Sequence, residues 1–325
     1  MKKSLLKILI CPLCKNNFKL KIQKENQKEI LEGILKCKCN EYKINNGIPR
    51  MVINKDLTKV KKRTANVWGY QWNYFKDFIK ESEEQFLRWL TPIKKEYFKG
   101  KLILDAGCGT GRHSYFSSKF GGKVIAIDLS NAVETAKEIN KDKNVEIVQA
   151  DIYNLPFKDN TFDFIYSIGV IHHLPDPSKG VESLIKKLKP GKQISIWLYG
   201  YENSLIMVKL IEPFRKILKN INLRLLNYIS LIITIPYFLI TKLIYRPVNK
   251  LKIKILENIF PYNEYFYQFS SFGFNHHWMN VFDKLNAPLA NYYKKEEARK
   301  LFKELKDVTI YPVNNIFLFQ FNIIQ

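Results

Sequence analysis

Apolar runs and stretches of helical periodicity alternate along the middle of the chain. Five short apolar runs, each bounded by turn residues, are typical of β-strands: Leu102–Asp105, Lys123–Asp128, Val145–Gln149, Phe162–Ser167 and Gln193–Tyr199. The stretches 112–120, 130–141 and 178–188 between them have helical spacing, and Lys189-Pro190-Gly191 ends the last one. Strands that alternate with helices predict an α/β fold with a parallel sheet and right-handed crossovers.

The flanking segments have different patterns. Residues 1–56 alternate as a small β-rich module does, and residues 201–292 are aromatic and basic with helical spacing. Near the end, Lys294–Leu305 predicts a helix, and Asp307–Tyr311 and Ile316–Asn322 predict two closing strands. We therefore expect four parts: a module at 1–56, a core at 57–200, a helical insertion at 201–292 that forms a lid or substrate region, and the rest of the core at 293–325.

A glycine-rich loop follows the first strand of the core. Gly107, Gly109 and Gly111 stand between a strand and a helix, which is the context in which such a loop binds a nucleotide-like ligand. Glycine lets the backbone turn tightly and approach that ligand. Asp105 adds an acid at the loop, and an acid suits a cationic amino-acid group better than a pyrophosphate.

Two more acids follow the next strands of the core. Asp128 ends the second strand, where a doubly wound sheet places a ribose-binding carboxylate, and Asp151 follows the third. The stretches LDAGCGTGR, AIDLS, QADIYNLPFKDNTFDFIYSIGVIHHL and LKPGKQISIW resemble the class I S-adenosylmethionine methyltransferases, in the subgroup that includes the ubiquinone and menaquinone C-methyltransferases. The resemblance covers residues 102–198 and implies a Rossmann-like, seven-stranded methyltransferase sheet.

The resemblance also implies roles for individual residues. In that family the glycine loop holds the methionine part of the cofactor, the acid ending strand two binds the ribose hydroxyls, and the acid after strand three meets the adenine amine. The matching positions are Asp105, Gly107, Gly109, Gly111, Asp128, Leu129, Asp151 and Ile152, with Ser167 and Gly169 beneath the sulfonium. Methyl transfer from a sulfonium is an in-line displacement, so the enzyme mainly has to position its substrates and exclude water.

Four of the five cysteines form two close pairs near the start of the chain. Cys11 and Cys14 bracket a CPLC knuckle, and Cys37 and Cys39 follow after a gap of 22 residues. Four thiolates can close a tetrahedral zinc site, and four buried thiols in a small β module are the alternative. The motifs CPLC and NGIPRMV, within residues 5–53, resemble the small zinc-ribbon-like partner proteins that activate tRNA and protein methyltransferases. So few cysteines also exclude a disulfide framework and suit a reducing compartment.

The formal net charge of +23 is unevenly distributed. Residues 1–63 carry +12 and residues 201–260 carry +7, whereas residues 64–200 carry only +3. The two basic segments would attract either phosphate groups or an anionic lipid surface. A compositional bias is the other explanation, because only 8 of the 53 basic residues are Arg.

The insertion begins after the fifth strand, at the sheet edge where ligands bind in this kind of fold. Its first stretch, 204–220, is amphipathic and includes the basic residues Arg215 and Lys216, and residues 225–241 carry no charge. A run of 17 residues that contains Pro236 is short for a membrane span. We therefore expect a lid helix or a peripheral membrane contact through residues 205–254.

Two histidines are candidate catalytic residues. His172 follows the fourth strand, and His276 lies in the insertion, where a lid could bring a general base to the acceptor. Each has a structural alternative, the ordering of a loop for His172 and an aromatic cluster for His276. The aromatic residues Trp68, Tyr70 and Trp72 precede the first strand, and their faces suit either a sulfonium or plain packing.

These features predict a cytoplasmic S-adenosylmethionine-dependent methyltransferase with structural zinc, peripheral to the inner face of the membrane if the insertion binds lipid. We expect its acceptor to be a small or lipid-linked molecule. One alternative is an RNA methyltransferase that binds its substrate through the basic N-terminal module. Another is a non-catalytic cofactor-binding module, which the intact acids Asp105, Asp128 and Asp151 disfavour.

Overall fold

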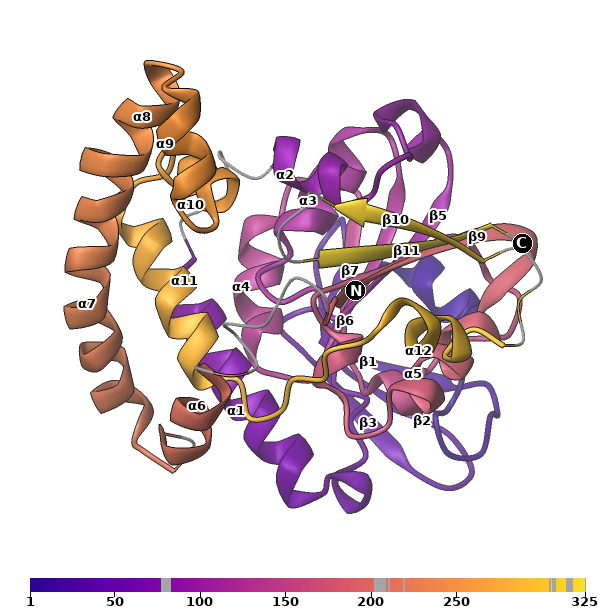
Figure 1. Cartoon of the computed structure of the whole chain (residues 1–325). Coiled ribbons are helices and arrows are strands. Elements are labelled where there is room, and N and C mark those ends of the chain that lie inside the picture. Colours follow the sequence, from indigo (N-terminus) through magenta and orange to yellow (C-terminus); the bar gives the residue numbers. More distant parts are fainter. Residues whose placement is uncertain are drawn as a thin grey trace.

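The computed structural model describes the chain except for residues 77–82, 202–208, 210, 219, 304, 306–307, 314–317 and 325. A central sheet has the strand order β10-β11-β9-β8-β5-β6-β7 (Figure 1). Its strands are β5 (Leu102–Ala106), β6 (Lys123–Asp128), β7 (Val145–Gln149), β8 (Phe162–Ile168), β9 (Leu188–Tyr199), β10 (Val308–Val313) and β11 (Leu318–Ile324). Strands β5 to β9 pair in parallel, and the antiparallel pair β10 and β11 extends the sheet from β9. The predicted parallel sheet is therefore confirmed as five strands, which the closing pair extends to seven.

The sheet is covered on both faces because its strands are apolar on both sides. Ile103 and Phe164 pack on one face with α2 (Glu83–Trp89), α3 (Arg112–Lys119) and α4 (Ala132–Ile139). Leu104 and Ile165 pack on the other face with α5 (Pro177–Ile185) and α12 (Lys295–Lys300). Short 3₁₀ turns lie at Lys3–Lys7, Asn54–Asp56, Lys95–Phe98, Ile152–Asn154 and Ile171–His173.

The N-terminal module is an antiparallel sheet of β1 (Lys19–Glu25), β2 (Ile30–Lys36), β3 (Glu41–Asn45) and β4 (Ile48–Pro49). It packs directly on the second face of the central sheet. Leu9 and Phe157 form a β-bridge between the two and are fully buried in one continuous hydrophobic cluster. The hydrophobic core therefore continues from the module into the central sheet, across the boundary predicted at residue 56.

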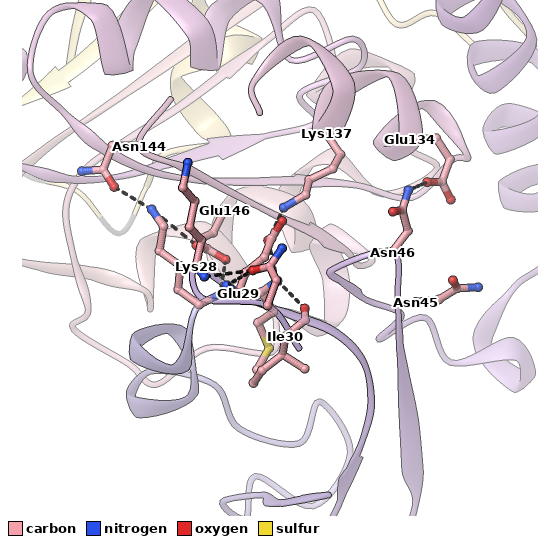
Figure 2. A network of polar contacts seen from close by, with 12 residues as sticks. Lys28, Glu29, Ile30, Asn45, Asn46, Glu134, Lys137, Asn144 and Glu146 are labelled. Carbon is pink, nitrogen blue, oxygen red and sulfur yellow. Dashed lines mark hydrogen bonds and ion pairs between the residues drawn. The ribbon is translucent and has the colours of Figure 1, made fainter. Parts of the chain in front are cut away.

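Polar contacts add to this docking on the side of α4 (Figure 2). Glu29 of the module pairs with Lys137 of α4 and, at 2.9 Å, with the Met1 amine. Nearby, the Lys2 amide donates to Glu146 of β7 at 3.0 Å. The Asn46 amide donates to Glu134 of α4 at 3.5 Å. These contacts fix the orientation of the module on the sheet.

The insertion is helical, as its spacing predicts. It comprises α6 (Glu212–Leu218), α7 (Leu223–Ile240), a π-helical turn (Thr241–Tyr245), α8 (Arg246–Lys250), α9 (Lys254–Ile259), α10 (Asn263–Phe269) and α11 (Phe274–Asn286). In Figure 1, α7 is the outermost helix, and α11 lies between it and α1 (Lys59–Tyr74). Buried apolar side chains such as Phe75, Leu226 and Phe282 hold these layers together.

Helix α7 continues through the π turn into α8. The continuous helix, Leu223–Lys250, has 28 residues and is the one described helix that is long and apolar enough, by length and composition, to cross a membrane. The expectation that this segment is too short was wrong, because it considered only the uncharged run and the helix extends beyond it. Length and composition alone do not distinguish a span from a surface or core helix.

Candidate cofactor and acceptor site

A cavity of about 860 Å³ lies where the carboxyl ends of the parallel strands meet α1 and the insertion. Seven of the residues predicted to bind the cofactor line it: Gly107, Gly109, Asp128, Leu129, Asp151, Ile152 and Gly169. Residues from four separate strand ends are thereby brought to one wall. The other three predicted residues, Asp105, Gly111 and Ser167, are not among the lining residues.

The glycine loop turns in the left-handed region. Gly107, Gly109 and Gly111 have φ angles of +88°, +53° and +75°. At Gly109 a β-carbon would lie 2.9 Å from Nε1 of Trp72, which reaches the loop from α1. Both the backbone conformation and the close indole therefore require glycine at this position.

Asp128 is fixed by three hydrogen bonds. The amide of Gly109 donates to its Oδ2 at 2.9 Å, and the amide and hydroxyl of Ser130 donate to its Oδ1 at 2.8 and 2.7 Å. Burial raises the pKa of the Asp128 carboxyl above its ordinary value. The side chain thus joins the glycine loop to the end of β6 and presents oxygen acceptors at the cavity.

Asp151 has a cationic partner that sequence reasoning missed. Nζ of Lys61 lies 2.7 Å from its Oδ2, and the amide of Tyr153 donates to its Oδ1 at 3.0 Å. Lys61 and Trp68 lie on the face of α1 that covers this wall, together with Trp72. The sequence signal for this face is the spacing of Lys61, Trp68 and Trp72 at i, i+7 and i+11, because residues at these positions lie on the same side of a helix.

Asp105 lies behind the loop. Its carboxylate accepts a 2.6 Å hydrogen bond from the Ser114 hydroxyl, and burial raises its pKa to about 7. The Ser167 hydroxyl donates to the carbonyl of Ala106 at 2.8 Å. The predicted direct contacts of Asp105 and Ser167 with the cofactor therefore do not fit this geometry, because both side chains are committed to the backbone and side chains beneath the loop. Gly111 supports the turn.

The other half of the cavity is formed by the insertion. Its lining is largely aromatic and aliphatic, with contributions from α6, α7, α10 and α11: Phe214, Leu218, Ile229, Ile233, Tyr237, Tyr265, Phe266, Phe269, Met279 and Leu285. Arg112 lies at this side between Trp72 and Trp89, 5.5 and 5.8 Å from the ring centres. Its burial lowers its pKa to about 10, so the guanidinium remains charged at neutral pH.

The histidines occupy different positions relative to the cavity. His172 is fully buried, stacks on Tyr199 at 3.9 Å and is not among the lining residues. Its neighbour His173 does line the cavity, and burial lowers its pKa to about 4. His276 lines the cavity as well, stacks on Phe272 at 4.0 Å and has its pKa lowered by burial to about 3.

These positions change the histidine prediction. An acceptor in the cavity would meet His173 and His276 rather than His172, and both imidazoles are neutral at pH 7. Of the three aromatic residues predicted to face the cofactor or pack, Trp68 and Trp72 line the cavity and stack with ring centres 6.2 Å apart. Tyr70 instead packs on Phe282 of α11 at 5.8 Å.

The four N-terminal cysteines converge on one point. The Sγ atoms of Cys11, Cys14, Cys37 and Cys39 all lie within 4.8 Å of one another. Three of the separations are 3.6 Å (Cys11 to Cys39), 3.6 Å (Cys37 to Cys39) and 3.8 Å (Cys14 to Cys37). A tetrahedron with Zn–S bonds of about 2.3 Å has edges of about 3.8 Å, so these residues fit a zinc ion.

Comparisons with known proteins agree with this geometry. Residues 104–196 match the family model described as a methyltransferase domain. Phosphoethanolamine N-methyltransferase 2 of Caenorhabditis elegans is 32% identical over 152 residues, which cover 44% of this chain and 34% of the relative. Demethylmenaquinone methyltransferase of Staphylococcus saprophyticus is 37% identical over 121 residues, covering 35% and 52%. The probable tRNA methyltransferase 9B of Homo sapiens is 30% identical over 145 residues, covering 44% and 30%.

The matches cover only part of this chain and only part of each relative. They span about a third to a half of the length of the curated relatives. S-adenosylmethionine is the cofactor that these matches imply. The acceptors in the relatives' names include a small amine, a quinone and a tRNA, so the shared segment determines the methyl donor and leaves the acceptor open.

Proposed function

We propose that the chain transfers the methyl group of S-adenosylmethionine to a small-molecule or lipid-linked acceptor. The match of residues 104–196 to the methyltransferase domain supports the methyl transfer. The methyl carbon passes to a nucleophilic acceptor atom, and the sulfonium becomes the neutral thioether of S-adenosylhomocysteine. Positive charge leaves the sulfur in this step, so a cavity that excludes water favours it. The cofactor would lie along Gly107, Gly109, Asp128 and Asp151.

The continuity of the cavity carries this proposal. One space of about 860 Å³ extends from the predicted cofactor residues to the side chains of the insertion. This volume is in the upper part of the range for small-molecule sites, which suits two ligands side by side. The aromatic and aliphatic lining on the insertion side favours an acceptor with a large apolar part.

The residues on the acceptor side of the cavity would mainly position the acceptor. Asp283 of α11 lines the cavity and accepts a 2.9 Å hydrogen bond from the Gln71 amide. His173 and His276 are neutral there and are weak bases because burial lowers their pKa values. We therefore assign catalysis to alignment and desolvation rather than to a strong general base.

RNA methylation is the second candidate. The relative named as a probable tRNA methyltransferase and the net charge of +12 on residues 1–63 favour it. The described residues that line the cavity begin at Thr64, so the basic module would have to bind RNA outside the cavity. The apolar lining favours the small or lipid-linked acceptor over a polyanion.

We also propose that Cys11, Cys14, Cys37 and Cys39 hold a structural zinc ion. Four thiolates would complete the coordination of the ion and leave no open position, as in structural zinc sites. Its effect would be to join the CPLC turn to the end of β2. Because the module packs on the central sheet, the ion would stabilise the wall that supports the cofactor site.

Acceptor labelling tests the proposed function. The purified chain is incubated with methyl-labelled S-adenosylmethionine and with a cell extract separated into lipid, small-molecule, protein and RNA fractions. We expect label in the lipid or small-molecule fraction, and none with a variant that carries Asp128→Ala. Label in the RNA fraction alone would establish the second candidate and refute the first.

A further inference from the structure

Helix α7 has its polar and apolar faces exchanged relative to a helix on the surface of a globular protein. Four polar residues are buried on the inner side of α7 and of the π turn that continues it: Asn227, Ser230, Thr234 and Thr241. On the opposite side runs a set of large apolar side chains at spacings of three and four, here called the outer stripe: Leu225, Tyr228, Ile232, Ile235, Leu239 and Leu243. Each of these is between 48% and 68% exposed. An amphipathic surface helix normally has the reverse arrangement.

The polar side is held in place by α11. Nε1 of Trp278 donates to Oγ of Ser230 at 2.9 Å, and Oγ1 of Thr241 is 2.9 Å from Nε2 of His277. These two contacts are eleven residues apart on the continuous helix Leu223–Lys250, so rotating the helix to bury the outer stripe would break both. The exposure of the stripe therefore follows from specific packing.

The charges around the stripe have one sign. Residues 213–256 contain nine Lys and Arg and no Asp or Glu. Exposed Arg224 precedes the uncharged run, and Lys242 follows it, with its Nζ donating to the carbonyl of Ser270 at 2.6 Å. Exposed Arg246 and Lys250 lie one and two turns further along the helix. The sequence predicts this role for Arg215, Lys216 and Lys219. Arg215 is buried and paired with Glu212, Lys216 is exposed, and Lys219 lies outside the described residues. An apolar face with basic flanks complements an anionic lipid surface.

We propose that the outer stripe of α7 inserts into the interfacial region of an anionic lipid bilayer, with the helix lying in the membrane plane. The stripe is about 27 Å long at 1.5 Å per residue. The opposite side of α7 stays packed on α11, so the helix contacts lipid along one side only. Arg224, Arg246 and Lys250 then meet lipid phosphates.

This orientation connects the membrane with the cavity. Phe214 and Ile233 line the cavity and are also 53% and 44% exposed. They make the apolar outer surface of α6 and α7 continuous with the lining of the acceptor side. A lipid-linked acceptor would enter the cavity from the lipid past this apolar surface. This consequence rests on the proposed function, whereas the lipid contact itself does not.

Sedimentation with vesicles tests the contact. The whole protein is mixed with vesicles of phosphatidylcholine alone or of phosphatidylcholine with phosphatidylglycerol. We expect it to sediment with the anionic vesicles and to be released by salt. Ile232→Ser combined with Leu239→Ser should weaken binding about tenfold or more, because two large apolar side chains leave the lipid. Arg246→Gln and Lys250→Gln should weaken it by roughly fivefold per residue.

Matched controls separate local from general effects. Ile22→Ser with Val60→Ser removes exposed apolar side chains elsewhere, and Lys24→Gln with Lys43→Gln removes exposed charges from the N-terminal module. Both controls should bind vesicles as the wild type does. Circular dichroism checks that each variant is folded.

Several outcomes would overturn the proposal. They are negligible binding of the wild type to both vesicle types, binding that the stripe variants leave unchanged, or a dimer in sedimentation velocity that buries the stripe and is dispersed by the same variants. The assay contains no cofactor. A protein that binds vesicles but not S-adenosylmethionine therefore refutes the proposed function alone, and the reverse result refutes the lipid contact alone.

Discussion

Asp128 joins the glycine loop to the end of β6 by its hydrogen bonds with Gly109 and Ser130. Replacing it by alanine removes the acceptors for the ribose hydroxyls of the cofactor. We expect Asp128→Ala to weaken binding of S-adenosylmethionine by about 2–3 kcal/mol, the range for hydrogen bonds to a charged group. Calorimetric titration measures the change. Asp142→Ala, which alters an exposed acid away from the cavity, serves as the control, and equal affinities would remove the ribose role from Asp128.

Asp105 gives the fold a pH dependence. Burial raises its pKa from 3.8 to about 7, so the folded state holds this proton more tightly than the unfolded state. The resulting stability is fully present below about pH 4 and is lost as the pH rises through 7, by at most on the order of 4 kcal/mol. Asp105→Asn should therefore gain stability relative to the wild type as the pH rises from 5 to 8.

Urea unfolding at several pH values measures this difference. The wild type and Asp105→Asn share all other titratable groups, so subtracting their unfolding free energies isolates the Asp105 contribution. A difference that stays constant from pH 5 to 8 would show that the buried carboxyl does not titrate in that range.

At the scale of elements, the cysteine cluster joins the CPLC turn to the end of β2. Elemental analysis should find about one zinc per chain, and Cys14→Ser should lower that content by removing one of four ligands. Cys108→Ala is the matched control, because Cys108 lies in the glycine loop away from the cluster and should leave zinc unchanged. Zinc-free protein that melts at the same temperature as zinc-containing protein would refute the zinc site.

The strands and the cofactor wall were predictable because their signals are local. Apolar runs such as Val145–Gln149 predict the strands, and acids such as Asp128 mark strand ends. The alternation of strands and helices brings the carboxyl ends of the strands to one edge of the sheet. Lys61 was missed because its partner Asp151 is 90 residues away. His172 and His173 could not be distinguished, since adjacent residues in a short turn point to different sides and only the packing decides which faces the cavity.

The exposure of the outer stripe of α7 could not be predicted from the sequence either. The uncharged run was visible, but which side faces the protein depends on Trp278 and His277 of α11. The sequence pattern left Ile232 and Leu239 open between a buried lid helix and a peripheral membrane contact, although apolar side chains are buried by default. The structure places them outside, and that reversal is the basis of the lipid proposal.

At the scale of the whole molecule, the N-terminal module and the central sheet share one hydrophobic cluster. Leu9 of the module is fully buried at this junction. We expect Leu9→Ala to destabilise the entire chain by about 2–5 kcal/mol, the range for deleting a buried leucine side chain. All five Trp residues lie between positions 68 and 278, outside the module, so their fluorescence reports only the core and insertion.

Thermal unfolding followed by tryptophan fluorescence tests this coupling. The midpoint of Leu9→Ala should fall together with the loss of secondary structure in one transition. Ile22→Ser, an exposed substitution in the same module, should leave the midpoint unchanged. An unchanged tryptophan midpoint for Leu9→Ala would mean that the module unfolds independently and that its packing on the sheet contributes little.

The central claim is that the cavity at the carboxyl ends of β5 to β8 binds S-adenosylmethionine. Isothermal titration of the purified chain with S-adenosylmethionine tests it most directly. We predict one binding site per chain, with the heat abolished when S-adenosylhomocysteine is present in excess. A folded protein that shows no heat and no gain in melting temperature at millimolar S-adenosylmethionine would contradict the account.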